Sequence, residues 1–138
     1  MQMQQTLPRL EPNLLRRALL GNAAFSTVCS LIMVFGSKPV VTLLGIDEPL
    51  ALVVIGVGIL LFAADVAWIA TRPQLDRKAA TLILILDIAW VVVSASLLLT
   101  DWVAFSSAGQ WAVAGVADVV AVFAVLEYFG LRQMGTNR

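Results

Sequence analysis

The sequence has no histidine and a single cysteine, Cys29, among its 138 residues. Without histidine, the chain has neither zinc–His nor haem–His ligation, and no Ser-His-Asp triad. One cysteine allows neither an internal disulfide nor a CxxC pair. We also find no Gly-rich phosphate loop, metal-ligand cluster or nucleophile beside a base. The sequence therefore predicts no catalytic residue, no cofactor and no metal site.

Charge is also scarce. Only 13% of the residues are charged, against roughly 25% in an ordinary soluble domain. Nine basic residues balance nine acidic ones, so no net basic field would attract nucleic acid.

Apolar residues dominate the composition. They make up 60% of the chain, and the mean hydropathy is +0.92, which excludes both a water-soluble globular domain and a disordered chain. Four apolar runs cover 14–35, 50–71, 79–100 and 110–131. Each approaches the roughly 20 residues that a helix needs to cross about 30 Å of hydrocarbon. Continuous runs of this length favour helices over the alternating strands of a membrane barrel.

These runs predict an all-α fold, a four-helix transmembrane bundle that alternates up and down and forms a single domain over 1–138. The apolar stretch of the first run is too long for a signal peptide and has no small-x-small cleavage site, so we interpret it as a retained helix. The short connection 72–78 predicts that the second and third helices form an antiparallel hairpin. For the apolar segment 38–45 two arrangements are open: an interfacial helix, or a continuation of the first helix beyond a proline bend.

Basic residues predict the orientation of the bundle. Lys38 alone lies on one side of the predicted membrane, and the other eight lie on the opposite side: Arg9, Arg16, Arg17, Arg72, Arg77, Lys78, Arg132 and Arg138. The positive-inside rule then places both termini in the cytoplasm. We expect a multi-pass protein of the plasma membrane, in a bacterium the inner membrane.

Three polar side chains are predicted to share one layer in the cytoplasmic half. At a rise of 1.5 Å per helical residue, Asp65 lies about 9 Å from the cytoplasmic boundary of the membrane. Asn22 and Asp87 lie about 12 Å from the same boundary. Lipid cannot satisfy them, so we expect all three to face the bundle interior. A repeated Asp-x-Ala-Trp places Trp68 and Trp90 on the faces of Asp65 and Asp87. At least one carboxylate is predicted to be neutralised by an arginine near the inner boundary, which is Arg16, Arg17 or Arg72.

Helical spacing also predicts which faces point inward. One stripe on the first helix carries Asn22, Ser26, Cys29 and Met33, and one on the third carries Asp87, Trp90 and Ser94. Small-residue faces that allow close helix contact are predicted on the second helix at Ala63, Ala67 and Ala70, and on the fourth at Ala114, Gly115, Asp118, Ala121 and Val122.

The polar layer has three interpretations. In the first, the side chains form interhelical hydrogen bonds that set the helix register. In the second, they form a proton or cation relay in which two neighbouring acids share a proton. In the third, they contact a partner protein or a pigment. Asp118, in the outer half, is either a protonated or hydrogen-bonded acid or an outer station of a relay. Glu127 lies near the end of the fourth run, where we expect it to pair with a basic residue such as Arg132.

The succession LLRRALLGNAAFS, K-P-x-V-x-x-L-L-G and a Gly-rich helix ending in W-x-x-x-R-P resembles small four-helix bacterial membrane proteins of uncharacterised function. In size and helix count the chain is similar to DoxX-like proteins. Small four-helix multidrug transporters carry a functional Glu in the middle of their first helix, where this chain has Asn22. No functional residue is carried over from these resemblances.

We expect a structural or accessory membrane subunit without catalytic activity, in contact with the lipid bilayer and assembled with itself or with a larger complex. The alternative is a small oligomeric proton-coupled transporter or channel that uses the intramembrane aspartates. A third and weaker alternative is an enzyme that acts on a lipid at the inner interface.

Overall fold

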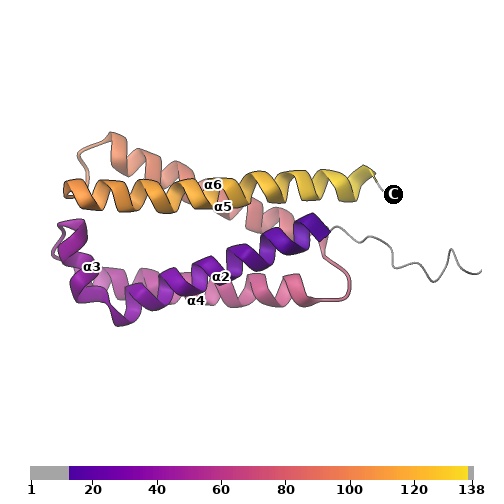
Figure 1. Ribbon diagram of the computed structural model, residues 1–138, viewed down its shortest axis with the longest axis horizontal. Coiled ribbons are helices and arrows are strands. Elements are labelled where there is room, and N and C mark those ends of the chain that lie inside the picture. Colours follow the sequence, from indigo (N-terminus) through magenta and orange to yellow (C-terminus); the bar gives the residue numbers. More distant parts are fainter. Residues whose placement is uncertain (1–12, 137–138) are drawn as a thin grey trace, which may run out of the picture.

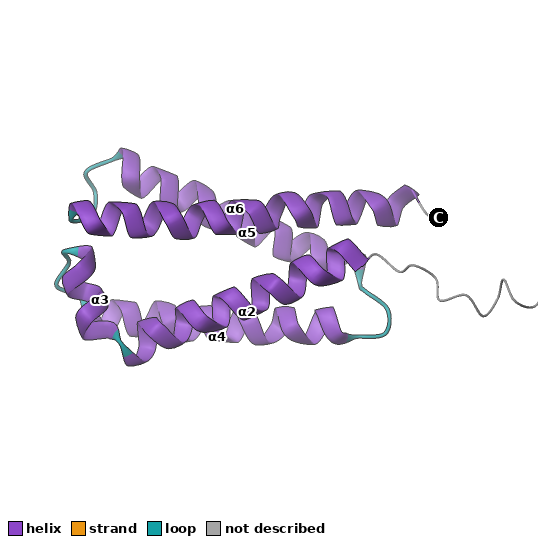
Figure 2. Cartoon of the chain, in the orientation of Figure 1, coloured by secondary structure: helices purple, strands orange, loops and turns teal. Residues whose placement is uncertain are grey.

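The computed structural model describes residues 13–136, and helices α2 to α6 account for nearly all of that range (Figures 1 and 2). The helices are α2 (Asn13–Phe35), α3 (Ser37–Leu44), α4 (Pro49–Thr71), α5 (Arg77–Leu99) and α6 (Ser107–Thr136). No strand occurs in these residues. The all-α prediction is confirmed, and the ends of the four long helices agree with the predicted runs to within a few residues, apart from the longer C-terminal part of α6.

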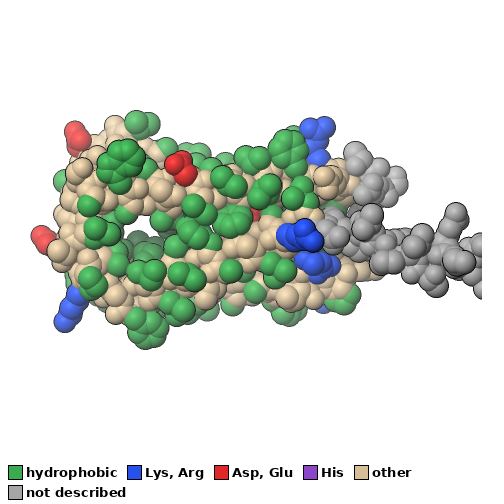
Figure 3. Space-filling view, viewed as in Figure 1, with side chains coloured by type: hydrophobic (Ala, Val, Ile, Leu, Met, Phe, Trp, Pro, Cys, Tyr) green, Lys and Arg blue, Asp and Glu red, His purple; other side chains and the backbone are tan. Residues whose placement is uncertain are grey.

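All four long helices are apolar enough to cross a membrane. Their mean hydropathies lie between 1.9 and 2.6, and no more than a third of each span is buried within the chain. Large apolar side chains such as Val28, Leu61 and Leu82 are therefore exposed. Figure 3 shows hydrophobic side chains along the length of the molecule and basic ones gathered toward its ends. This distribution is that of a multi-pass protein whose outer surface contacts lipid.

The long helices pack as two antiparallel pairs, α2 with α4 and α5 with α6, and α2 also packs against α6 (Figure 1). The predicted hairpin between α4 and α5 is wrong in one respect: the two helices are joined by a short loop but make few contacts. The loop fixes only the ends that it joins. Beyond them α5 slopes across α6 and away from α4 (Figure 1).

Helix α3 joins α2 to α4 in the chain and lies at the end of the molecule opposite the α4–α5 loop. It contacts α2, α4 and α6 and ends at Gly45, whose φ of 73° is a conformation that suits glycine. Its last carbonyl groups bind Ser106, which donates its backbone N–H to Leu44 and its hydroxyl to Leu43. The same hydroxyl accepts the N–H of Gly109 and caps α6. The segment 38–45 is thus a separate helix docked on the bundle, not a continuation of α2.

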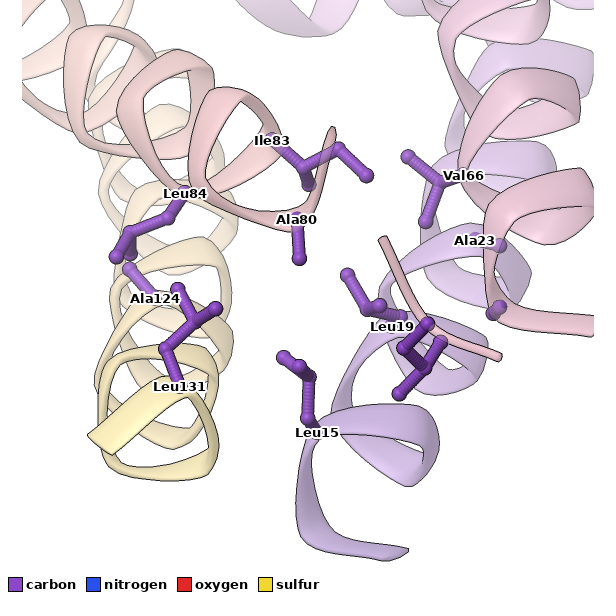
Figure 4. Packing of buried hydrophobic residues seen from close by; sticks show 11 residues of the cluster. Leu15, Leu19, Ala23, Val66, Ala80, Ile83, Leu84, Ala124 and Leu131 are labelled. Atoms are coloured by element: carbon purple, nitrogen blue, oxygen red, sulfur yellow. The ribbon is translucent and has the colours of Figure 1, made fainter. Parts of the chain in front are cut away.

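The apolar core lies toward the other end, which we call the terminal end because α2 begins and α6 finishes there. Eleven buried side chains from α2, α4, α5, α6 and the α4–α5 loop form an apolar core (Figure 4). Gly130 of α6 lies against Leu15 of α2: a Cβ added to this glycine would come within 2.7 Å of Leu15 Cβ and 2.8 Å of Leu15 Cα. Only a residue without a side chain permits this separation of the two helices.

The inward face of α6 differs from the predicted one. Gly115, Asp118 and Val122 are exposed, and Ala114 and Ala121 are half-buried, so the predicted small-residue face is only partly buried. The buried face of α6 consists of Ala117, Val120, Ala124, Glu127, Gly130 and Leu131. The small residues of α4 follow the prediction better, since Ala63 and Ala70 are buried and Ala67 is half-buried.

The contact between Gly130 and Leu15 gives the first testable prediction. Gly130→Ala is expected to lower the free energy of unfolding by about 1–3 kcal/mol, because the added methyl group must displace backbone as well as side-chain atoms. The measurement is thermal or denaturant unfolding of the purified protein in mild detergent. Gly115→Ala is the matched control on the same helix, since a Cβ there meets no atom within 4 Å. Equal stabilities of the two variants would contradict the close approach of α2 and α6.

Candidate functional site

The side-chain amide of Asn22 joins three helices inside the bundle. Its Nδ2 donates to Asp87 Oδ2 of α5 at 2.6 Å and to Glu127 Oε1 of α6 at 2.9 Å. Its Oδ1 accepts the hydroxyl of Ser26 at 3.1 Å. Asn22, Asp87 and Glu127 are at most 4% exposed. We refer to these three residues as the polar cluster.

Helix geometry explains why the three side chains meet. Each lies roughly two and a half to three turns from the terminal end of its helix: Asn22 from Asn13, Asp87 from Arg77 and Glu127 from Thr136. They therefore occupy one level, next to the apolar core. The sequence predicted Asn22 and Asp87 at a common depth but missed Glu127, because the fourth run appeared to end at 131.

The polar cluster contains two carboxyl groups and no cation. Within the part of the chain that the structure describes, no arginine or lysine forms an ion pair with either acid. Two buried carboxylates on one amide would repel each other without compensation, so the cluster favours a shared proton or a nearby cation. The second oxygen of Glu127, Oε2, is buried and has no hydrogen-bond partner among the described residues.

An apolar cavity of about 670 Å³ adjoins the cluster on the side toward α3. It forms where α4 and α5 diverge, and Figure 3 shows the surface hollowed between α2 and α6 near that end. Its walls include Phe25, Ile59 and Phe62, and its polar lining includes Asp87 and Ser94. Trp90 also lines it, and the buried Nε1–H of this tryptophan has no hydrogen-bond partner among residues 13–136.

Two predicted stripes meet at this cavity. Asn22 is buried in the polar cluster, and Ser26, Cys29 and Met33 of the same stripe line the cavity. Asp87, Trp90 and Ser94 line it from α5. The structure thus brings together Asn22, Asp87 and Trp90 from the predicted site.

Asp65 is not part of the cluster, and the prediction that it faces the interior is wrong. Its side chain is exposed on α4 and has no hydrogen bond or ion pair among the described residues. The buried face of α4 is set by Gly56, Ala63 and Ala70, and Asp65 lies about 150° around the helix from it. Small residues thus decide which face packs against α2. Trp68 follows Asp65 to the outside and is 62% exposed.

The predicted neutralisation of a carboxylate by an arginine is also wrong. Arg16 donates instead to three backbone carbonyls at the end of α4, those of Ala70, Arg72 and Pro73. These carbonyls lack intrahelical donors, and a guanidinium group satisfies several of them at once. Arg72 lies over the ring of Trp68, 4.3 Å from its centroid. Arg17 is exposed.

The sequence predicted that Asp118 faces inward and that Glu127 pairs with a basic residue near the helix end, but Glu127 is the buried acid and Asp118 the exposed one. Nine residues separate them, which places them about 180° apart on α6. With Glu127 fully buried, Asp118 is necessarily outward, and its side chain is exposed. The expected pairing of Glu127 with Arg132 does not occur, because the Arg132 guanidinium lies over Tyr128, 5.9 Å from the ring centroid. The nine-residue spacing alone shows that the two acids lie on opposite faces of the helix.

Comparisons with known proteins add no family. No family model matches the chain, and the comparisons with curated proteins and with solved structures gave no match. The structure shows a small multi-pass membrane protein with four candidate spanning helices. The likeness to uncharacterised four-helix bacterial membrane proteins and to DoxX-like proteins stays a prediction.

The polar cluster gives the second testable prediction. Asn22→Leu is expected to lower the free energy of unfolding by about 1–3 kcal/mol, because Asp87 and Glu127 lose their common donor while staying buried. Ser30→Ala is the control: Ser30 is equally buried on α2, but its hydroxyl binds only the carbonyl of Thr27. Unfolding in detergent measures both variants. A stable Asn22→Leu protein would show that the three helices do not depend on the amide.

The contact of Arg16 with the end of α4 gives the third testable prediction. Arg16→Ala is expected to cost about 1–2 kcal/mol, since it removes charge-assisted bonds to otherwise unpaired carbonyls. Hydrogen exchange of the α4–α5 loop should also accelerate. Arg17→Ala removes the same charge from the neighbouring, exposed position and should change neither measurement. Equal effects of the two variants would mean that the charge matters and not the contact.

Proposed function

We propose that this chain is a non-catalytic subunit of a larger membrane assembly, formed with further copies of itself or with a partner. The observation that carries the proposal is the outward direction of Asp65 and Asp118. Both lie within candidate spans, both are exposed, and neither has a hydrogen bond or ion pair within residues 13–136. A neighbouring protein surface is the environment that would satisfy them.

The cost of leaving these acids in lipid supports the proposal. Asp118 lies about 16 Å along α6 from Ser107, close to the middle of a membrane. An acidic residue at that depth costs about 2.5–3.5 kcal/mol on insertion scales. Aspartate is too short to extend its charge to the headgroups as lysine does. A donor from a second protein would remove that cost.

The proposed orientation follows from the basic residues. In the described range they gather at the terminal end, as Arg16, Arg17, Arg72, Arg77, Lys78 and Arg132, whereas Lys38 lies at the α3 end. The positive-inside rule supports a cytoplasmic terminal end and hence cytoplasmic N and C termini. The corresponding location is the plasma membrane, the inner membrane of a bacterium.

A second candidate is proton-coupled transport or conduction. The buried pair of Asp87 and Glu127 beside the cavity supports it, because two acids that share a proton are suited to exchanging it. The aspartate expected to act with Asp87 was Asp65, and it faces away from the cavity. In liposomes this candidate requires a pH-dependent flux that Asp87→Asn or Glu127→Gln abolishes.

The assembly gives the fourth testable prediction. Protein extracted from native membranes in polymer-bounded discs should have a mass well above the 14.8 kDa of one chain by native mass spectrometry, whether from further copies or from a partner. Asp65→Leu or Asp118→Leu should weaken the assembly at least tenfold, because each removes the acceptor for a neighbour's donor.

Ser96→Leu provides the control, since Ser96 is an outward polar residue of α5 that bonds only to its own helix. A monomer in which both leucine variants are more stable than the wild type would refute the proposal. That result would mean that the carboxylates face lipid.

A further inference from the structure

We propose that the cavity between α4 and α5 binds a lipophilic cation, an amphipathic molecule with a charged ammonium-type nitrogen or its equivalent, with the cation next to Asp87. This inference is independent of the assembly proposed above. It rests on the position of the polar cluster beside the cavity, on the charge of the lining and on the buried Glu127 oxygen that has no partner among the described residues.

The dimensions suit a small molecule. Small-molecule sites typically enclose about 300–1,000 Å³ and combine apolar walls with a few convergent polar groups. The cavity has a volume of about 670 Å³, walls such as Ile59, Phe62 and Val116, and polar groups confined to a few positions. Figure 3 shows the surface hollowed between α2 and α6 near the α3 end, so a ligand dissolved in the bilayer can enter from that side.

The charge of the cavity lining favours a positively charged ligand. The lining includes the carboxyl group of Asp87, which shares Asn22 with Glu127, and it includes no lysine or arginine. An anion would therefore be repelled, whereas a cation would compensate the acid pair. Phe25, Phe62 and Trp90 also line the cavity, and aromatic faces attract cations that have shed their water.

An unpartnered acceptor beside the cavity supports a cation over a lipid chain. Trp90 Nε1 and Glu127 Oε2 are the two buried side-chain atoms without a hydrogen-bond partner in the described part of the chain. One lines the cavity, and the other belongs to the polar cluster that borders it. Glu127 Oε2 is a hydrogen-bond acceptor that a nearby positive charge would compensate, whereas Trp90 Nε1–H is a donor and does not select a cation. A lipid acyl chain would fill the apolar walls but leave the carboxyl pair uncompensated.

The test compares two probes of equal shape and opposite charge, tetraphenylphosphonium and tetraphenylborate, by equilibrium dialysis against the full chain in nanodiscs, with empty nanodiscs subtracted. We expect saturable binding of the phosphonium and none of the borate. Asp87→Asn should weaken phosphonium binding at least tenfold. Asp101→Asn removes an exposed carboxylate just beyond the end of α5 and should leave binding unchanged.

A second variant tests the cavity without touching the acids. Gly58 lines the cavity, and a Cβ there would meet nothing within 4 Å, so Gly58→Leu should occupy space and weaken binding several-fold while the protein stays folded. Gly115→Leu is the matched control, because that position is equally open but lies outside the lining. Binding that is equal for the two probes, absent for both, or unaffected by Asp87→Asn and Gly58→Leu would overturn the proposal.

Discussion

The absence of water from the bilayer interior means that a buried polar side chain must find its partner within the protein, and in this chain Asn22 is that partner. One amide group satisfies acceptors on two other helices, Asp87 of α5 and Glu127 of α6. Because α2 also packs along α4, it contacts each of the other three long helices through packing or hydrogen bonds. The apolar core lies at and beyond this level toward the terminal end, and the cavity lies toward α3.

Small residues set the geometry around that central helix. Gly130 allows α6 to approach the start of α2, and Gly56 allows α4 to approach Ser30 and Met33 further along it. Gly109 provides a third close approach, of α6 to Leu44 at the end of α3. No such contact joins α4 to α5, so those two helices separate beyond their loop. The cavity lies on this side of the bundle, toward α3, where α4 and α5 are apart.

Carboxyl groups occur in two different environments in the spans. Asp87 and Glu127 are buried and share an internal donor, whereas Asp65 and Asp118 are outward and have none within the described chain. Lipid penalises the second arrangement more than the first, since a lone acid in hydrocarbon has neither a hydrogen-bond donor nor water. The buried pair favours a cation in the cavity, and the outward acids favour a neighbouring protein around the bundle.

The sequence by itself determined the class, the four spans and part of the site. Length and apolar composition are enough for the spans, because a membrane demands about 20 apolar residues whatever the fold. The stripe through Asn22, Ser26, Cys29 and Met33 was readable because spacing along one helix fixes which residues share a face. Only the tertiary structure decided which face of each helix turns inward. Asp65 and Glu127 show the reason: an acid in a span can be buried or outward, and the choice depends on how closely neighbouring backbones approach. That approach is set by Gly56, Ala63 and Gly130 acting between helices, and no spacing within a single helix records which helix packs against which.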